Sequence, residues 1–212
     1  MLFNSLSLNE HVSKSRVKNL LTASTDLVPL DEKKKINLYT KCLRNDGTYK
    51  IGYERPELKA FGRVTPKPHT GLGVFCRTVR GYLANEVYID VDMVNCHPVL
   101  LHTTFKEHGL DDSIIGDYVA DREAFLAREG IEKTDFLAML NKEDFKGTGV
   151  MKALHDQIYK VLVPALQQKF KGIKIKKGDG YNLKGKFIAN YLQDMELKVL
   201  SRLYQFGQEN GF

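Results

Sequence analysis

The chain has 212 residues, 42% of them hydrophobic, and a formal net charge of +6. This length and apolar content suffice for one sizeable core or two small lobes. The sequence contains neither a run near the roughly 18 apolar residues of a membrane span nor the continuous apolar segment of a signal peptide. Its three cysteines lack C-x-x-C spacing, which argues against a disulfide framework or structural zinc. We therefore expect an intracellular protein that is not secreted and has no membrane partner.

The positive charge is concentrated in one part of the chain. Residues 160–200 contain nine lysines and three acidic residues, whereas the rest of the chain is balanced. The stretch "KFKGIKIKKGDGYNLKGKF" (169–187) within it is typical of a basic patch that binds a polyanion. A solvated lysine-rich loop would have the same composition, so the pattern alone leaves both interpretations open.

The first half of the chain predicts helices around one strand. Residues 1–44 have a basic, amphipathic helical pattern, and the proline-containing segment 51–70 is irregular. The segment "GLGVFCRTVRGYLA" (71–84) predicts a helix. "EVYIDVD" (86–92) predicts a strand because it is β-branched and aromatic. A helix should follow over 98–110, since proline is tolerated in the first turn.

The second half is predicted to be helical. The segment 121–130 ends at a glycine, 133–145 follows it, and 149–170 is a long amphipathic helix that Pro164 should kink or split. Residues 182–212 form the last long helix. We therefore predict the α+β class, with a small sheet and predominantly helical surroundings.

Two aspartates at the end of the predicted strand suggest a metal site. Asp90 and Asp92 lie two residues apart, so on a strand their side chains share one face. Adjacent carboxylates repel unless a cation neutralises them, and Mg²⁺ typically binds one or two carboxylates together with substrate phosphates. The alternative is that one aspartate caps the next helix and the other faces solvent.

The stretch "DVDMVNCHP" (90–98) resembles motif A in the palm domain of family A DNA polymerases. In that motif a metal-binding aspartate ends a strand, and a residue five positions later lies under the sugar of the incoming nucleotide. The resemblance implies that Asp92 and Asp90 are the catalytic metal ligands and that Asn95 and His97 contact the nucleotide. A purely structural role for His97 in the turn is the alternative.

Other segments resemble the same family. Upstream, Gly62, Arg63, Arg77 and Arg80 match a run whose arginines contact primer–template DNA. Downstream, "REGIEKTDFLAMLN" (128–141) resembles the fingers helix that holds the triphosphate and the base, and it offers Phe136 or Leu137, and Asn141, in comparable places. Exposed helix charges would explain the fingers residues equally well. The implied DNA-binding residues are Arg63, Arg77, Arg80, Asn190, Gln193, Lys184 and Lys186, and the implied nucleotide-binding residues of the fingers are Arg128 and Lys133.

Together these segments are most similar to transposon-virus polymerase domains, which are divergent family A-like palms of large DNA viruses and mobile elements. The resemblance implies an N-terminal helical region (1–49) and a palm and fingers region (50–212). It implies nucleotidyl transfer from dNTPs to a primer 3′-OH on primer–template DNA, with two Mg²⁺ ions, and a C-terminal superfamily 3 helicase domain as partner. The second catalytic carboxylate of motif C is expected beyond residue 212, so we expect the chain alone to have little activity. A viral protein of this kind would act in the host nucleus or a cytoplasmic virus factory.

Three other functions are compatible with the same residues. A primase-like activity would use the same carboxylates without a primer, and a non-catalytic DNA-binding module of a replication helicase would need only the basic residues. A zinc enzyme using Cys96, His97 and His102 is disfavoured, because adjacent side chains on a turn do not easily face one metal.

Overall fold

A computed structural model describes residues 5–55, 62–67, 71–89, 91–170 and 181–211. The chain folds into two compact units, and each is described by itself. The first unit contains the described residues up to 55 and those from 64 to 92. The second contains residues 62 and 63 and those from 93 onward.

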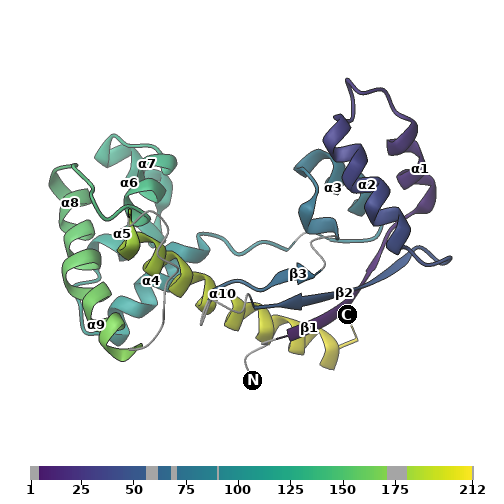
Figure 1. Ribbon diagram of the computed structural model, residues 1–212. Helices are drawn as coiled ribbons and strands as arrows, with labels where there is room; N and C mark the ends of the chain where they lie inside the picture. The colour runs from purple at the N-terminus through teal and green to yellow at the C-terminus, as the bar shows by residue number, and fades with distance from the viewer. Residues whose placement is uncertain (1–4, 56–61, 68–70, 90, 171–180, 212) are drawn as a thin grey trace. The chain divides into compact units, whose positions relative to one another are not determined.

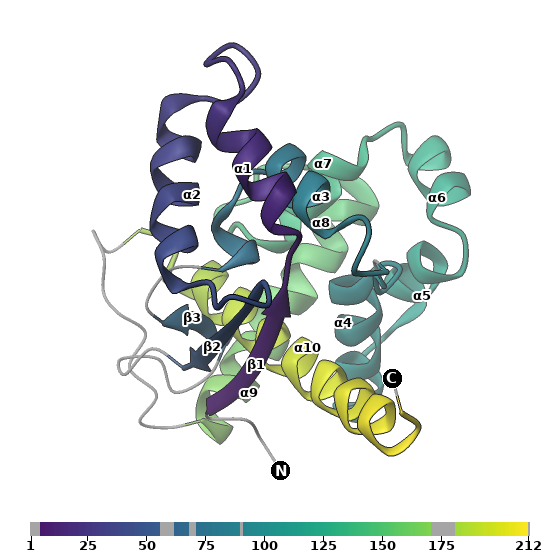
Figure 2. The same ribbon diagram turned by 90° about the vertical axis from the view of Figure 1, so that its right-hand side faces the viewer.

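The first unit is a three-stranded antiparallel sheet with helices on one side (Figure 1). The strands β1 (Ser5–His11), β2 (Thr48–Glu54) and β3 (Thr65–Lys67) pair in the order β1-β2-β3, with Leu8 opposite Ile51. The helices are α1 (Lys14–Thr22), α2 (Leu30–Cys42), the 3₁₀ turn η1 (Leu72–Val74) and α3 (Arg77–Ala84). Helices α1 and α2 pack side by side (Figure 2).

Strand β1 corrects the prediction that residues 1–44 are helical. Its segment "SLSLNEH" places Leu6, Leu8 and Glu10 on one face and exposed polar residues on the other. This alternation is the pattern of a strand with one buried face. The basic helical pattern that starts at Lys14 is confirmed only for α1 and α2.

A buried carboxylate joins the sheet to the helices of the first unit. Glu10 on β1 accepts hydrogen bonds from the Leu72 backbone N–H at 3.0 and 3.1 Å, from the Tyr39 hydroxyl at 3.2 Å and from the Tyr53 hydroxyl at 3.3 Å. Burial raises the pKa of Glu10, and these hydrogen bonds oppose the shift. Because four chain segments meet at this side chain, it fixes β1 against α2 and η1.

The second unit is helical. It contains α4 (Cys96–Glu107), α5 (Ser113–Ala120), α6 (Arg122–Glu129), α7 (Lys133–Leu140), α8 (Gly149–Asp156), the π-helical turn η2 (Gln157–Leu162), α9 (Val163–Lys169) and α10 (Leu183–Glu209). The first half of α10 packs into the hydrophobic core of this unit through Phe187, Ile188 and Leu192. The second half of α10 projects from that core (Figure 1). The predicted break at Pro164 appears as η2 followed by α9, because proline offers no N–H to the helical ladder.

The predicted α+β class is confirmed, but the strand predicted at 86–92 is wrong. The described residues of this segment form a turn and an irregular stretch, and none of them joins the sheet. The side chains of Ile89 and Val91 are 91% and 70% exposed. A β-branched segment forms a strand only where a neighbouring strand satisfies its backbone groups, and the described residues supply none. Among the described residues, no helix combines the length and apolar content needed to cross a bilayer.

Candidate nucleic-acid interface

Helix α4 begins at Cys96, two residues before the predicted start, and Pro98 lies in its first turn as expected. Asn95 has a left-handed backbone conformation (φ 50°), which asparagine tolerates better than most residues, and its carbonyl accepts from the Val99 N–H. Its side-chain Oδ1 accepts a hydrogen bond from Nη1 of Arg122 at 2.9 Å. Arg122 opens α6, so this contact ties the α4 turn to a second helix.

Glu196 joins two of the predicted site residues. Its Oε2 accepts from Nε and Nη2 of Arg63 at 3.3 and 3.2 Å and lies 3.5 Å from Nε2 of His97. The side chain of Glu196 is 17% exposed, that of His97 25% and that of Arg63 60%. Two segments distant in sequence from α10 therefore converge on one of its carboxylates, and most of the Arg63 side chain remains open to solvent.

The same face of α10 carries Asn190 and Gln193. These residues and Glu196 are spaced by three, which places them along one side of a helix. Gly62, with φ 118°, lies against Asn190, since a Cβ at Gly62 would approach the Asn190 Oδ1 to 3.0 Å. The amide nitrogen of Asn190 donates to the Lys186 carbonyl at 2.7 Å. The Gly62–Arg63 turn thus needs a residue without a side chain to reach this helix face.

The predicted fingers residues make other contacts. Arg128 donates to Asp117 at 3.2 Å and to Glu129 at 2.9 Å, and the hydrogen bond to Glu129 raises its pKa. Lys133 is the exposed first residue of α7. Phe136 is fully buried and stacks on Tyr118 with 3.7 Å between ring centroids. The Phe136 ring therefore belongs to the core of the second unit, and Leu137 is the alternative at this place in the motif.

Four further predicted DNA-binding residues are exposed. Arg77 and Arg80 lie one turn apart on α3 in the first unit, and neither forms an ion pair with the part of the chain that the structure describes. Lys184 and Lys186 lie in the first turns of α10. The middle of the basic stretch, 171–180, lies outside the described residues. These exposed cations thus remain candidates for DNA binding.

The carboxylates of the predicted metal site are only partly described. Asp90 lies outside the described residues. Asp92 is exposed and forms no hydrogen bond or ion pair with any described residue, so its carboxylate is available to a cation. No group of three His, Cys, Asp or Glu side chains within the described ranges could hold a metal. His102 instead bonds Asp112 at 2.8 Å, so the zinc set of Cys96, His97 and His102 is not formed.

Sequence reasoning missed Glu196 and Arg122. Glu196 follows Asn190 and Gln193 at the same spacing, so the helical period would have placed it on their face. Arg122 follows Asp121, whose side chain accepts from the Ala124 N–H at 3.0 Å as the cap of α6. That capping pattern predicts the helix start and not the long-range contact to Asn95.

Comparison with known proteins gives one partial match. The chain is 31% identical over 131 residues to a Sputnik virophage protein described as "Putative helicase V13"; the match covers 56% of this chain and 16% of that protein. The chain therefore corresponds to a small part of that relative's length. No family model matches the chain. No solved structure matches it either.

Proposed function

We propose that this chain is the palm and fingers region of a template-directed DNA polymerase within a viral or mobile-element replication protein. The observation that carries the proposal is that Arg63 and His97 both contact Glu196, although Arg63 and Glu196 are 133 residues apart in the sequence. Motif resemblance assigns Arg63, His97 and Asn190 to one DNA-facing and nucleotide-facing site. The similarity to a virophage protein described as a helicase supports a role in replication.

Each residue would have a distinct task in this function. Arg63 uses one edge of its guanidinium for Glu196 and keeps further N–H groups for a backbone phosphate of the primer–template. His97 would lie under the sugar of the incoming dNTP. The amides of Asn190 and Gln193 would contact base edges in the minor groove, where donors and acceptors are few.

Asp92 fits one ligand position of a Mg²⁺ site, because it is exposed and has no partner among the described residues. We propose Asp90 as the second ligand on the same segment. When bound, Mg²⁺ neutralises the phosphate charge that develops during nucleotidyl transfer. A two-metal site requires a further carboxylate, and we propose a superfamily 3 helicase domain as the partner of this region.

The test is primer extension by the full-length protein, with Mg²⁺ and all four dNTPs. We expect extension by the wild type and a loss of about 100-fold or more in Asp92→Asn, since a metal ligand is removed. Asp26→Asn, which alters an exposed aspartate of the same unit, is the matched control and should extend normally. Normal extension by Asp92→Asn would contradict the assignment. Extension from unprimed template would indicate primase-like activity.

A non-catalytic DNA-binding module is the second candidate. It is favoured by the absence of a strand in the described part of 86–92. It is also favoured by Arg77 and Arg80, which are exposed and form no ion pair within the described ranges. In this case the wild type would not extend a primer. It would bind DNA with a strong salt dependence, and Asp92→Asn would bind equally well.

A further inference from the structure

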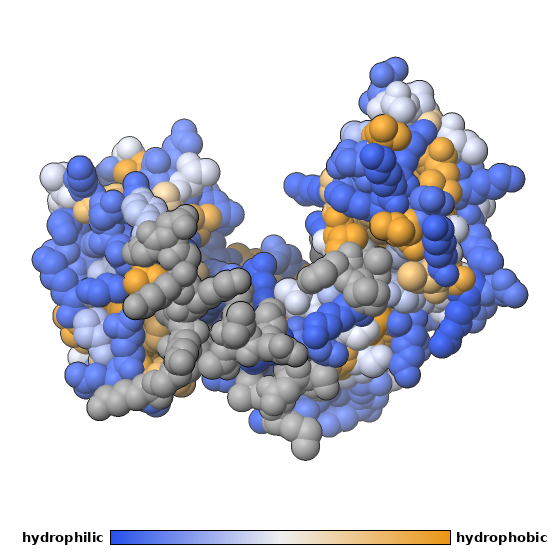
Figure 3. All heavy atoms as spheres, viewed as in Figure 1, coloured by the Kyte–Doolittle hydropathy of each residue, from blue (hydrophilic) through white to orange (hydrophobic). Residues whose placement is uncertain are grey.

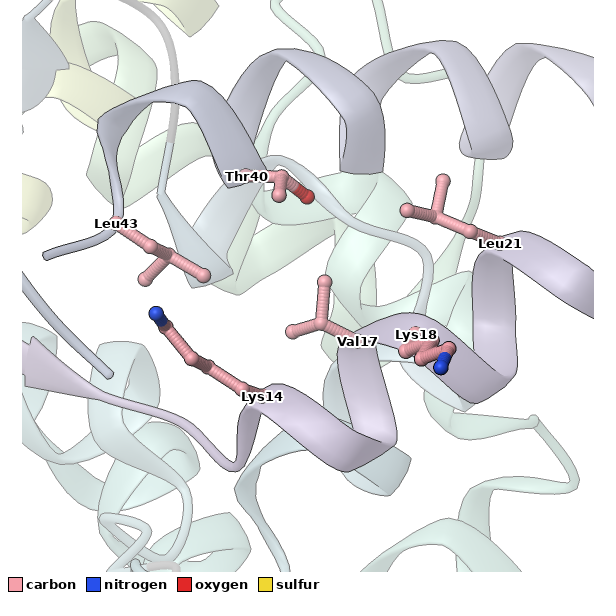
Figure 4. Close-up of a pocket in the computed structure, with 6 residues that line it drawn as sticks. All are labelled: Lys14, Val17, Lys18, Leu21, Thr40 and Leu43. Atoms are coloured by element: carbon pink, nitrogen blue, oxygen red, sulfur yellow. The ribbon is translucent and has the colours of Figure 1, made fainter. Parts of the chain in front are cut away.

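A pocket of about 320 Å³ lies between α1 and α2 in the first unit (Figure 4). Lys14, Val17, Lys18 and Leu21 line it from α1, and Thr40 and Leu43 line it from α2 and the residue after it. The volume is at the lower end of the roughly 300–1,000 Å³ found for ligand pockets. It suits one aliphatic side chain better than a large cofactor.

The interior of the pocket is apolar. Val17 is buried in the core of the first unit, and Leu21 and Leu43 pack against that core. The Thr40 hydroxyl already donates to the Ile36 carbonyl at 2.8 Å, so the pocket leaves that group no unmet hydrogen bond. The helices of this unit also expose hydrophobic residues between hydrophilic ones (Figure 3). An occupant would therefore be held by burial of apolar surface.

The rim of the pocket carries two lysines and no acidic residue. Lys14 and Lys18 are one turn apart on α1, a spacing at which like charges repel. Helix α1 has no acidic residue, the pocket lining has none, and neither lysine is ion-paired within the described chain. By contrast, Lys35 on α2 pairs with Asp31 and Glu32. Figure 4 shows the Lys14 ammonium directed toward Leu43, at the edge of the apolar interior.

We propose that this pocket binds an acidic segment of a partner protein that inserts one aliphatic side chain between α1 and α2. The lysines would pair with acidic residues on either side of that anchor. Nucleic acid is the less suitable occupant, because no aromatic side chain lines the pocket and unpaired bases are usually held by stacking. This proposal is independent of the polymerase function, since it concerns other residues of the first unit.

The test is selection of binders from a displayed library of random twelve-residue peptides on the intact chain. We expect enriched peptides with a leucine, isoleucine or methionine flanked by Asp and Glu. Synthetic versions should lose affinity by about 10- to 100-fold on Thr40→Phe, which fills the pocket from an exposed position. They should lose about tenfold on the double change Lys14→Glu and Lys18→Glu.

The control is the double change Lys34→Glu and Lys50→Glu, which alters the net charge by the same amount at exposed lysines outside the pocket. It should leave the affinity for the peptides within about twofold of the wild-type value. Circular dichroism of every variant checks that the unit remains folded. The proposal is overturned if no acidic–aliphatic peptide is enriched, or if such peptides bind Thr40→Phe as well as wild type. Oligothymidine binding that depends on Lys14 and Lys18 but not on Thr40 would assign the lysines to DNA and also overturn it.

Discussion

The contact between Arg63 and Glu196 yields a prediction that separates folding from DNA binding. Nε and Nη2 of Arg63 donate to the same oxygen of Glu196, at 3.3 and 3.2 Å, and the Arg63 side chain is 60% exposed. Because solvent reaches most of the Arg63 side chain, it screens the ion pair, which contributes about 0–1 kcal/mol to stability. Arg63→Ala should therefore lower the free energy of unfolding by less than about 1 kcal/mol.

The same substitution should weaken binding to primer–template DNA. If Arg63 contacts one phosphate, its loss removes about one unit from the slope of log affinity against log salt concentration. Glu196→Gln should have the opposite effect, a rise in affinity of a few-fold, because it removes a negative charge beside the phosphate and releases Arg63. The two substitutions should thus change the affinity for primer–template DNA in opposite directions, although they alter the same contact.

Fluorescence anisotropy with labelled primer–template, measured over a series of salt concentrations, tests this prediction. Arg202→Ala is the matched control, because Arg202 is also exposed on α10 and bonds only Gln205 among the described residues. The reasoning is refuted if Arg63→Ala leaves the salt slope unchanged, or if Glu196→Gln weakens binding. Urea unfolding of the same variants, followed by circular dichroism, measures the stability change.

Three further predictions concern two buried side chains and one cap residue of α10. Because burial raises the pKa of Glu10, the contribution of this group to stability is complete below its unfolded-state pKa and is lost as pH rises through its folded-state pKa. Glu10→Gln should remove this pH dependence from the free energy of unfolding, measured with urea at several pH values. An unchanged pH profile would contradict this prediction. Phe136→Ala should lower the free energy of unfolding in urea by about 3–5 kcal/mol, because it removes a buried ring stacked on Tyr118. A decrease of less than about 1 kcal/mol would contradict the core position of Phe136. The Asn182 side chain accepts a hydrogen bond from the Glu143 N–H at 2.9 Å and donates one to the Asn141 carbonyl at 2.7 Å. Asn182→Ala should therefore lower the melting temperature by an amount equivalent to about 1–3 kcal/mol. An unchanged melting temperature would contradict this prediction.

Elements with local signals could be predicted from the sequence. Helix α6 begins after the Asp121 cap and ends at Gly130, whose φ of 64° suits glycine. Helix α4 begins at the turn before Pro98. Each of these boundaries depends on side chains within four residues of the boundary, so a sequence window contains all the information needed.

Elements that depend on distant partners could not be predicted in the same way. The segment 86–92 has the composition of a strand, yet its described residues lack a pairing partner. Strand β1 exists because β2 pairs with it across some forty residues, and the amphipathic pattern around Lys14 concealed its alternation. Strand formation is thus decided by the partner as much as by the segment.

The candidate site shows the same division between local and distant information. Resemblance to polymerase motifs selected Arg63, His97 and Asn190, but not Glu196, the carboxylate that Arg63 and His97 share. Glu196 is 17% exposed and Arg63 is 60% exposed, so the carboxylate is held in the helix packing while the guanidinium can move. A phosphate that competes for Arg63 would leave Glu196 beside His97. In the free protein Glu196 neutralises and orients the Arg63 guanidinium, so under the proposed function a polyanion would exchange for Glu196 at Arg63.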